Sequence, residues 1–371
     1  MRHATVPTSS RRSRVLLFYL SRELVLRVAT TGAILVALME ILALLEQLTP
    51  ILERHLGLGG VLYFTLLRAP MLLGTICPLA VLIGALLLLV QMTTNSEIAI
   101  LRAAGLSTPG LVALCLPAVL GLGLADMVLD DQVTPRTELV LAQWWNETDP
   151  HPEAGHGFWF RSGATLVDVG YAAEGGRLLC KVDLYRRDAA GRLTQASHLD
   201  SARYAHGHWI GGLGRGLHVA SVSVRPAALP SGPIRDLDGP DPLTPAQVMR
   251  LAADTPPLSA AAAISMLQGR APSSQPPGYL RTALLDRALT PLTFVVMLLL
   301  ALPVVYIPPR TGTRSWLPVW CLGAGLLFVV FQGLLRALGN AGTLPALLAT
   351  LPGVVIFTCA VGVVMLRIEE R

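Results

Sequence analysis

Lysine is almost absent from this 371-residue chain. Lysine and arginine together number 29, but the only lysine is Lys181. A P-loop, which holds the phosphates of ATP, needs the pattern GxxxxGK[ST]. Lys181 lies instead in Leu-Leu-Cys-Lys-Val-Asp. The chain therefore has no Walker-type ATPase site of its own.

Charged residues and catalytic motifs are scarce as well. Charged residues make up 14% of the chain, against about 25% in soluble domains. HExxH is absent, and Gly105-Leu-Ser107 lacks the second glycine of GxSxG. His206 and His208 alternate along an expected strand, but no third ligand follows at a suitable spacing, which favours exposed polar residues near a turn. The sequence predicts no catalytic residue, no metal and no cofactor.

The five cysteines do not form a disulfide framework. No CxxC pattern occurs, and Cys180 is the only cysteine in the polar part of the chain. The other four lie in apolar segments, where cysteine behaves as a small buried hydrophobe.

Long apolar runs are what the chain does have. Each of six runs comes close to the ~20 residues that a helix needs to cross a bilayer core of ~30 Å. The runs cover Leu24–Leu48, Val61–Met92, Leu111–Leu129, Leu284–Ile307, Trp316–Leu338 and Leu344–Leu366. The first is too long for a signal peptide, so we expect it to be retained. We predict a polytopic α-helical membrane protein, with spans in residues 1–129 and 279–371 around a polar domain of residues 130–278.

The arginines indicate how the spans are oriented. Cytoplasmic flanks of membrane proteins carry an excess of basic residues. Five arginines precede the first run: Arg2, Arg11, Arg12, Arg14 and Arg22. Arg310 and Arg314 lie between the fourth and fifth runs, on the same predicted side. We therefore expect cytoplasmic termini and a periplasmic polar domain. Because the basic residues lie mainly beside spans, the net charge of +5 does not indicate nucleic-acid binding.

The polar domain shows strand patterns followed by two short helices. Thr244, Pro245 and Gln247 form a capping-box pattern at the start of the first helix, and Ser259–Leu267 is the second. The expected strands cover Phe158–Phe160, Ala164–Val169, Leu178–Tyr185, Leu193–His198, His208–Ile210 and Leu217–Val224, with a hairpin turn at Asp188–Gly191. This spacing predicts an antiparallel sandwich or barrel-like sheet.

Charged residues inside the runs are candidates for function because charge is costly in lipid. Among them are Arg27, Glu40, Glu46, Arg68, Asp126 and Arg336. For the three arginines, the favoured interpretation is that the side chain reaches the interface. Glu40 lies deeper, so we expect it to face protein or a water-filled cavity.

A short helix is predicted between the second and third runs. Thr94-Asn95-Ser96 offers N-caps, Glu97 suits the positive end of a helix, and Ala104–Gly105 ends a helix of about two turns. So short a helix is marginal by itself, which leaves two interpretations open: docking on a partner protein, or a simple interfacial connector.

At this point the chain resembles the lipopolysaccharide-export permease family, LptF/LptG. The family's pattern for this loop is matched by Ser96, Glu97, Ile98, Leu101, Ala103, Gly105, Leu106 and Ser107. Tyr19-Leu20 with Arg22-Glu23, Gly84-Ala85-Leu86 and Val133-Thr134-Pro135 also look like family segments. The resemblance implies three spans, a periplasmic jellyroll-like domain and three more spans. It also implies that the short helix couples the permease to an ATPase.

Within the family the chain looks more like the G-type than the F-type subunit. Gly157-Phe158-Trp159 followed by Gly163, and Glu46-Gln47-Leu48, are similar to G-type segments. Lysines that G-type chains often carry near the lipid phosphates would fall on Ala43, Thr49 and Pro50, none of which is basic. We therefore expect the phosphate contacts at Arg54, Arg68 or Arg136.

The resemblance also implies partners. They are a second six-span permease (LptF-like), a dimeric cytosolic ATPase (LptB-like), and a bitopic periplasmic bridge protein (LptC-like) with its downstream partner. The implied function is extraction of lipopolysaccharide from the inner membrane, with no covalent chemistry in this chain. A secondary transporter and a membrane-embedded lipid-modifying enzyme remain as alternatives.

Overall fold

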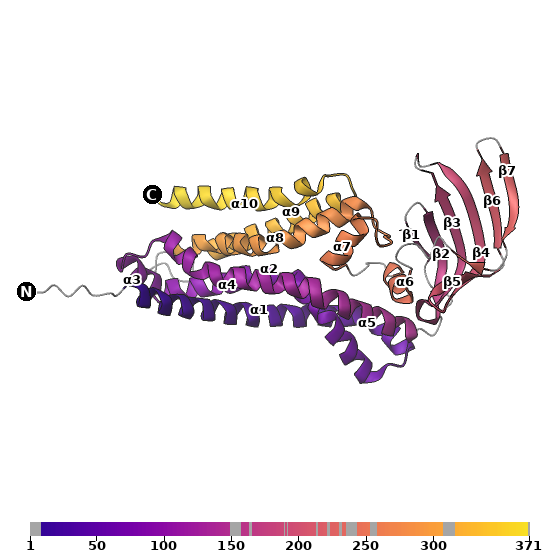
Figure 1. Cartoon of the computed structure of the whole chain (residues 1–371). Helices are drawn as coiled ribbons and strands as arrows, with labels where there is room; N and C mark the ends of the chain where they lie inside the picture. Colours follow the sequence, from indigo (N-terminus) through magenta and orange to yellow (C-terminus); the bar gives the residue numbers. More distant parts are fainter. Residues whose placement is uncertain are drawn as a thin grey trace, which may run out of the picture. The chain divides into compact units, whose positions relative to one another are not determined.

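Six helices are long and apolar enough to cross a membrane (Figure 1). The structure is a computed structural model that describes residues 9–148, 157–162, 165–188, 190, 192–212, 214–220, 223–229, 232–234, 243–252, 258–306 and 316–369. The candidate spans are Arg14–Glu53, Gly57–Thr94, Thr108–Trp145, Pro277–Tyr306, Leu317–Asn340 and Ala346–Arg367. An antiparallel sheet is inserted between the third and fourth spans. The predicted fold class is confirmed. Arg2, Arg310, Arg314, Gly163 and Gly191, which the sequence analysis used, lie outside the described residues.

The chain divides into two compact units. The first contains Met1–Leu45, Ala69–Asp130 and Thr282–Arg371, and the second contains Glu46–Arg68 and Asp131–Arg281. The second unit thus includes Glu46–Arg68, where the first two helices meet, whereas the predicted ranges place these residues with the spans. Apolarity alone could not separate these residues from the spans to which they are covalently joined.

Helices form the first unit around one apolar core. Leu20, Leu24 and Val28, spaced by four residues, place one buried stripe of α1 in that core. Gly84 of α2 lies against it, since a Cβ atom there would meet the backbone nitrogen of Val28 at 2.9 Å. Small residues permit such close approach between helices in membranes. The helices are α1 (Ser9–Glu53), α2 (Gly57–Thr94), α3 (Glu97–Ala103), α4 (Thr108–Val128), α8 (Pro277–Ala301), α9 (Leu317–Asn340) and α10 (Ala346–Glu369), with α1 and α2 continuing into the second unit.

The third span does not end where its apolar run ends. After α4 a π-helical turn (Leu129–Val133) leads directly into α5 (Thr134–Glu147). The polar residues of this turn find partners, so the helix can continue. Asp130 accepts a hydrogen bond from Arg287 Nε at 3.2 Å within the first unit. Asp131 accepts one from the backbone nitrogen of Ala260 at 2.6 Å within the second.

One eight-stranded antiparallel sheet forms the centre of the second unit. Its main path runs β1-β2-β3-β4-β5-β8, and β6 pairs with both β4 and β7. The strands are β1 (Phe158–Ser162), β2 (Thr165–Ala173), β3 (Leu178–Arg187), β4 (Leu193–Ala205), β5 (His208–Gly211), β6 (Gly214–Ala220), β7 (Ser223–Leu229) and β8 (Gly232–Pro233). The prediction of one strand over Leu217–Val224 was wrong. The predicted range covers parts of two antiparallel strands, in which Ala220 pairs with Ser223, and alternation alone does not separate them.

A tryptophan and a capped helix close the core of the sheet. Trp209 on β5 is fully buried, and its Nε1 donates to the carbonyl oxygen of Leu243 at 2.6 Å. Helix α6 (Pro245–Leu251) follows, with the predicted capping box between Thr244 and Gln247. Helix α7 (Ala260–Leu267) matches the helix predicted over Ser259–Leu267. Ser259 is its N-cap and accepts from the backbone nitrogen of Ala262.

Candidate functional site

The loop between α2 and α4 holds the predicted coupling helix as α3. Two left-handed residues bracket it, Ser96 with φ 60° and Gly105 with φ 90°. Ser96 therefore turns the chain into α3 through its backbone, and its hydroxyl makes no capping hydrogen bond. The expected side-chain cap at Ser96 was wrong, because its left-handed backbone replaces the extended geometry of an ordinary N-cap. Ser107 does cap the next helix, by accepting from the backbone nitrogen of Gly110 at 3.3 Å.

One face of α3 is fixed to the helical core. Ile98 is buried in the core cluster, and Leu101 packs partly against it. The guanidinium of Arg102 lies 4.6 Å from the ring centroid of Tyr306, close enough for a cation–π contact. The hydroxyl of Tyr306 in turn lies 3.0 Å from Thr108 Oγ1. These contacts give the short helix the tertiary support that its length requires.

The opposite face of α3 is exposed. Ala103 and Gly105 are exposed, and Glu97 is half-buried, with Asn95 Nδ2 donating to it at 3.3 Å. Ile100 is 67% exposed, although it is a large apolar residue. Ile100 was not among the site residues predicted for this helix. Its position off the apolar stripe of Ile98 and Leu101 was the available signal.

The three arginines expected to contact phosphate all belong to the second unit. Arg54 donates to the carbonyl oxygen of Trp145 at 2.8 Å, and its guanidinium lies 4.0 Å from that ring's centroid. Arg68 lies 5.7 Å from the ring centroid of Phe64. Arg136 is exposed and makes a long hydrogen bond of 3.4 Å to Gln132. Of the three, Arg136 is the one that is exposed, whereas Arg54 and Arg68 are half-buried.

Aromatic rings of α2 and α5 pack against one another beside Arg54, which contacts Trp145. Tyr63 meets Trp144 edge to face, with centroids 5.1 Å apart, and Phe64 lies 5.4 Å from Trp145. Aromatic rings of this amphipathic kind are enriched at membrane–water interfaces. The cluster packs α5 against the hairpin formed by α1 and α2.

The two acids expected inside the first span differ in burial. Glu40 is 5% exposed, as expected for an acid that faces protein. Glu46 is exposed and belongs to the second unit.

Ion pairs hold most of the other charges in the spans. Arg27 pairs with Glu23 at 2.8 Å and donates to the carbonyl oxygen of Leu87. Arg336 pairs with Asp286 at 2.7 Å, across α9 and α8. Each of these two arginines therefore has an acceptor on its own or a neighbouring helix, and their reach to the membrane interface stays a prediction.

Asp126 is the exception among these charges. It is 7% exposed, and its Oδ1 atom has no hydrogen-bond partner in the described part of the chain. Gly74 lies beside it, since a Cβ atom there would be 3.8 Å from that oxygen.

A row of titratable side chains crosses the exposed face of the sheet. Asp168, Asp183 and His198 are direct neighbours on β2, β3 and β4. Asp183 Oδ1 lies 2.7 Å from His198 Nδ1. Partial burial and the charge of Asp183 raise the pKa of Asp168. Among the described residues no group of histidines, cysteines or acids could hold a metal ion, and His206 and His208 are exposed beside a turn.

Comparison with known proteins identifies the family of this chain. The family model described as lipopolysaccharide export system permease LptF/LptG matches residues 18–367. The chain belongs to the LptF/LptG family. Two relatives are the lipopolysaccharide export system permease protein LptG of Escherichia coli strain K12 and that of Escherichia coli O6:H1. Each is 22% identical over 351 residues, which cover 94% of this chain and 97% of the relative. This LptF/LptG protein is thus a multi-pass transport permease.

Proposed function

We propose that this chain is the G-type permease subunit of a lipopolysaccharide exporter in the bacterial inner membrane. It extracts lipopolysaccharide together with a second six-span subunit, and a dimeric cytosolic ATPase hydrolyses the ATP. Family membership and the lack of a P-loop in this chain support this division of labour. The names of its relatives, both LptG proteins, favour the G-type subunit.

The observation that carries the ATPase proposal is the two-sided character of α3. Ile98 anchors the helix in the core, while Ile100 and Ala103 present a small apolar surface away from it. Such a surface suits a groove in a partner, because an exposed isoleucine gains burial there. Because α3 is fixed to the core at one face, a movement of the bound partner would be transmitted through it to the spans.

Co-purification tests this docking. Ile100→Asp and Glu97→Lys, in a tagged full-length chain, are expected to lose the ATPase while the chain still inserts. Leu58→Asp is a control, because Leu58 is 89% exposed and lies at the other end of α2. Recovery of equal ATPase with Ile100→Asp, Glu97→Lys and the wild type would refute the docking role.

The orientation proposed from the arginines puts α3 and both termini in the cytoplasm and the sheet in the periplasm. Accessibility of single cysteines to an impermeant thiol reagent in intact cells tests it. A cysteine at exposed Arg203, on β4, should react from the periplasm, and one at exposed Ala103 should not. Reaction of the cysteine at position 103 alone would show the opposite orientation in the membrane.

Arg136 is the proposed primary contact for the lipid phosphates, with Arg54 and Arg68 in support. Its guanidinium is exposed and only weakly engaged, whereas Arg54 is held by Trp145. Arg136→Ala should weaken photo-crosslinking to lipopolysaccharide more than Arg68→Ala does. Unchanged crosslinking and export after replacement of all three would remove this assignment.

The sheet is proposed to pass the lipid to a bridge protein by strand addition. Strand β7 pairs only with β6 among the described strands, so it offers one edge for pairing. Cysteine crosslinks between β7 and the bridge protein should form in cells. If they form only at β1, the opposite edge is the site of transfer.

A further inference from the structure

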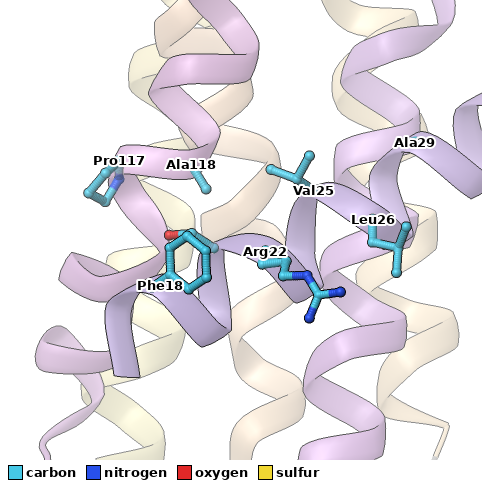
Figure 2. A pocket seen from close by; sticks show the side chains of 8 residues that line it. Phe18, Arg22, Val25, Leu26, Ala29, Pro117 and Ala118 are labelled. Atoms are coloured by element: carbon cyan, nitrogen blue, oxygen red, sulfur yellow. The ribbon is translucent and has the colours of Figure 1, made fainter. Parts of the chain in front are cut away.

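An apolar groove lies between α1 and α4 within the first unit (Figure 2). Its volume is about 580 Å³. Phe18, Val25 and Leu26 line it from α1, and Pro117 lines it from α4. Pro117 cannot donate a backbone hydrogen bond inside its helix, and such a proline commonly kinks a helix.

An uncompensated cation lies in the same groove. Arg22 is exposed, and it makes no ion pair or hydrogen bond with any residue that the structure describes. The neighbouring arginine on the same helix, Arg27, is in contrast paired with Glu23. The hydroxyl of Ser21, also in the groove wall, has no partner within the described ranges. The groove thus combines an apolar surface with the positive charge of Arg22.

The position of Arg22 along α1 matches the layers of a bilayer. It directly precedes the apolar run that begins at Leu24. Ala29, which also lines the groove, lies seven residues further on, about 10 Å deeper along the helix axis. A molecule with an anionic head at Arg22 and a hydrocarbon tail beside Val25 and Ala29 would satisfy both parts of the groove.

We propose that this groove binds an anionic glycerophospholipid, with its phosphate on Arg22 and an acyl chain along α1 and α4. Charge complementarity selects an anion, and the apolar wall selects a lipid rather than a free phosphate. The volume lies within the range of about 300–1,000 Å³ for small-ligand pockets, which suits one acyl chain better than the many chains of lipid A. The site is separate from the phosphate contacts proposed for export and does not depend on them.

Lipid titration of the purified full-length chain tests the proposal. The delipidated chain is titrated with phosphatidylglycerol and with phosphatidylcholine of the same acyl chains, and bound lipids are counted by native mass spectrometry. One basic residue at a membrane surface contributes about 1 kcal/mol to binding of anionic lipid. We therefore expect phosphatidylglycerol to bind about fivefold more tightly than phosphatidylcholine. Arg22→Gln should remove this preference, and Arg22→Lys should largely keep it.

Two matched controls separate the groove from general charge and bulk. Arg14→Gln makes the same charge change on an exposed residue of α1 outside the groove, and should keep the preference. Ala29→Leu fills the groove and should weaken the binding of both lipids. Ala37→Leu, at an exposed position of the same helix, should leave the binding of both lipids unchanged.

Three results would overturn the proposal. The first is equal binding of the two lipids by the wild type, or equal losses with Arg14→Gln and Arg22→Gln. The second is displacement of phosphatidylglycerol by equimolar lipopolysaccharide, which would assign the groove to the exported lipid. The third is release of the lipid when the second six-span subunit binds, which would make the groove a protein interface.

Discussion

Gly84→Ala is the sharpest test of how α1 packs on α2. A Cβ atom at Gly84 would lie 2.8 Å from Val28 Cγ2, 2.9 Å from Val28 N and 3.0 Å from Val28 Cα. Two of these three atoms are backbone, so the side chain of Val28 cannot relieve the clash by rotating. Either the two helices must separate, or one must shift along the other.

The expected magnitude follows from two opposing effects. Overpacking of this kind costs about 1–3 kcal/mol. Replacement of a glycine inside a helix by alanine gains about 1 kcal/mol of helix preference. Gly84→Ala should therefore destabilise the protein by up to about 2 kcal/mol. Gly121→Ala on α4 is the matched control, because nothing lies within 4 Å of its Cβ position, and it should stabilise slightly.

Unfolding by titration with SDS in mixed micelles, followed by tryptophan fluorescence, compares the two variants directly. Val28→Ala should rescue Gly84→Ala only in part, since the backbone contacts of Val28 remain. Equal unfolding midpoints for Gly84→Ala and Gly121→Ala would refute the close approach of α1 and α2.

Three further predictions concern the sheet and the spans. Trp209→Phe removes the donor to the Leu243 carbonyl. It should lower the free energy of unfolding of the sheet by about 1–3 kcal/mol, measured by hydrogen exchange of β5. Unchanged exchange would show that this hydrogen bond contributes nothing to stability. The backbone nitrogen and the side chain of Arg192 lower the pKa of Asp188 below its ordinary value of 3.8. The carboxylate of Asp188 therefore stabilises the β3–β4 connection above pH 3.8. This stabilisation is lost as the pH falls through the lowered pKa. Asp188→Ala should remove that acid dependence from hydrogen exchange of β3, corrected for intrinsic rates, and an unaltered pH profile would contradict the assignment. Asp286→Asn takes the charged partner from Arg336 and should lower the midpoint of unfolding by SDS. Asp126→Asn replaces a buried acid whose Oδ1 has no hydrogen-bond partner among the described residues, and should not lower that midpoint. The reverse order would contradict the pairing of Arg336 with Asp286.

Local patterns predicted much of this fold, and contacts between distant residues account for what they missed. The capping box at Thr244 and Gln247 was predictable because all its bonds lie within one helical turn. The continuation of α4 into α5 was not, since it depends on Arg287, 157 residues away from Asp130. For the same reason the pairing of Arg336 with Asp286 could not be read from the apolar run that contains Arg336.

The candidate site shows the same limit. The boundaries of α3 follow from its loop sequence, but the exposure of Ile100 depends on which face the core takes up. Arg54 is held by Trp145 while Arg136 stays exposed because of how α5 packs against the α1–α2 hairpin. Arg54 and Trp145 are 91 positions apart in the sequence. Spacing along the chain carries no information on that choice.

The aromatic packing of α5 decides how the sheet could be produced as a soluble fragment. A fragment cut at Asp130 would carry Trp144 and Trp145 without Tyr63 and Phe64, which cover them in the full chain. The two exposed indole rings on this helix would promote aggregation of the fragment. A fragment that begins at Gly157 avoids them. It should extend past Ser273, whose backbone exchanges two hydrogen bonds with Arg161 and so protects the outer edge of β1.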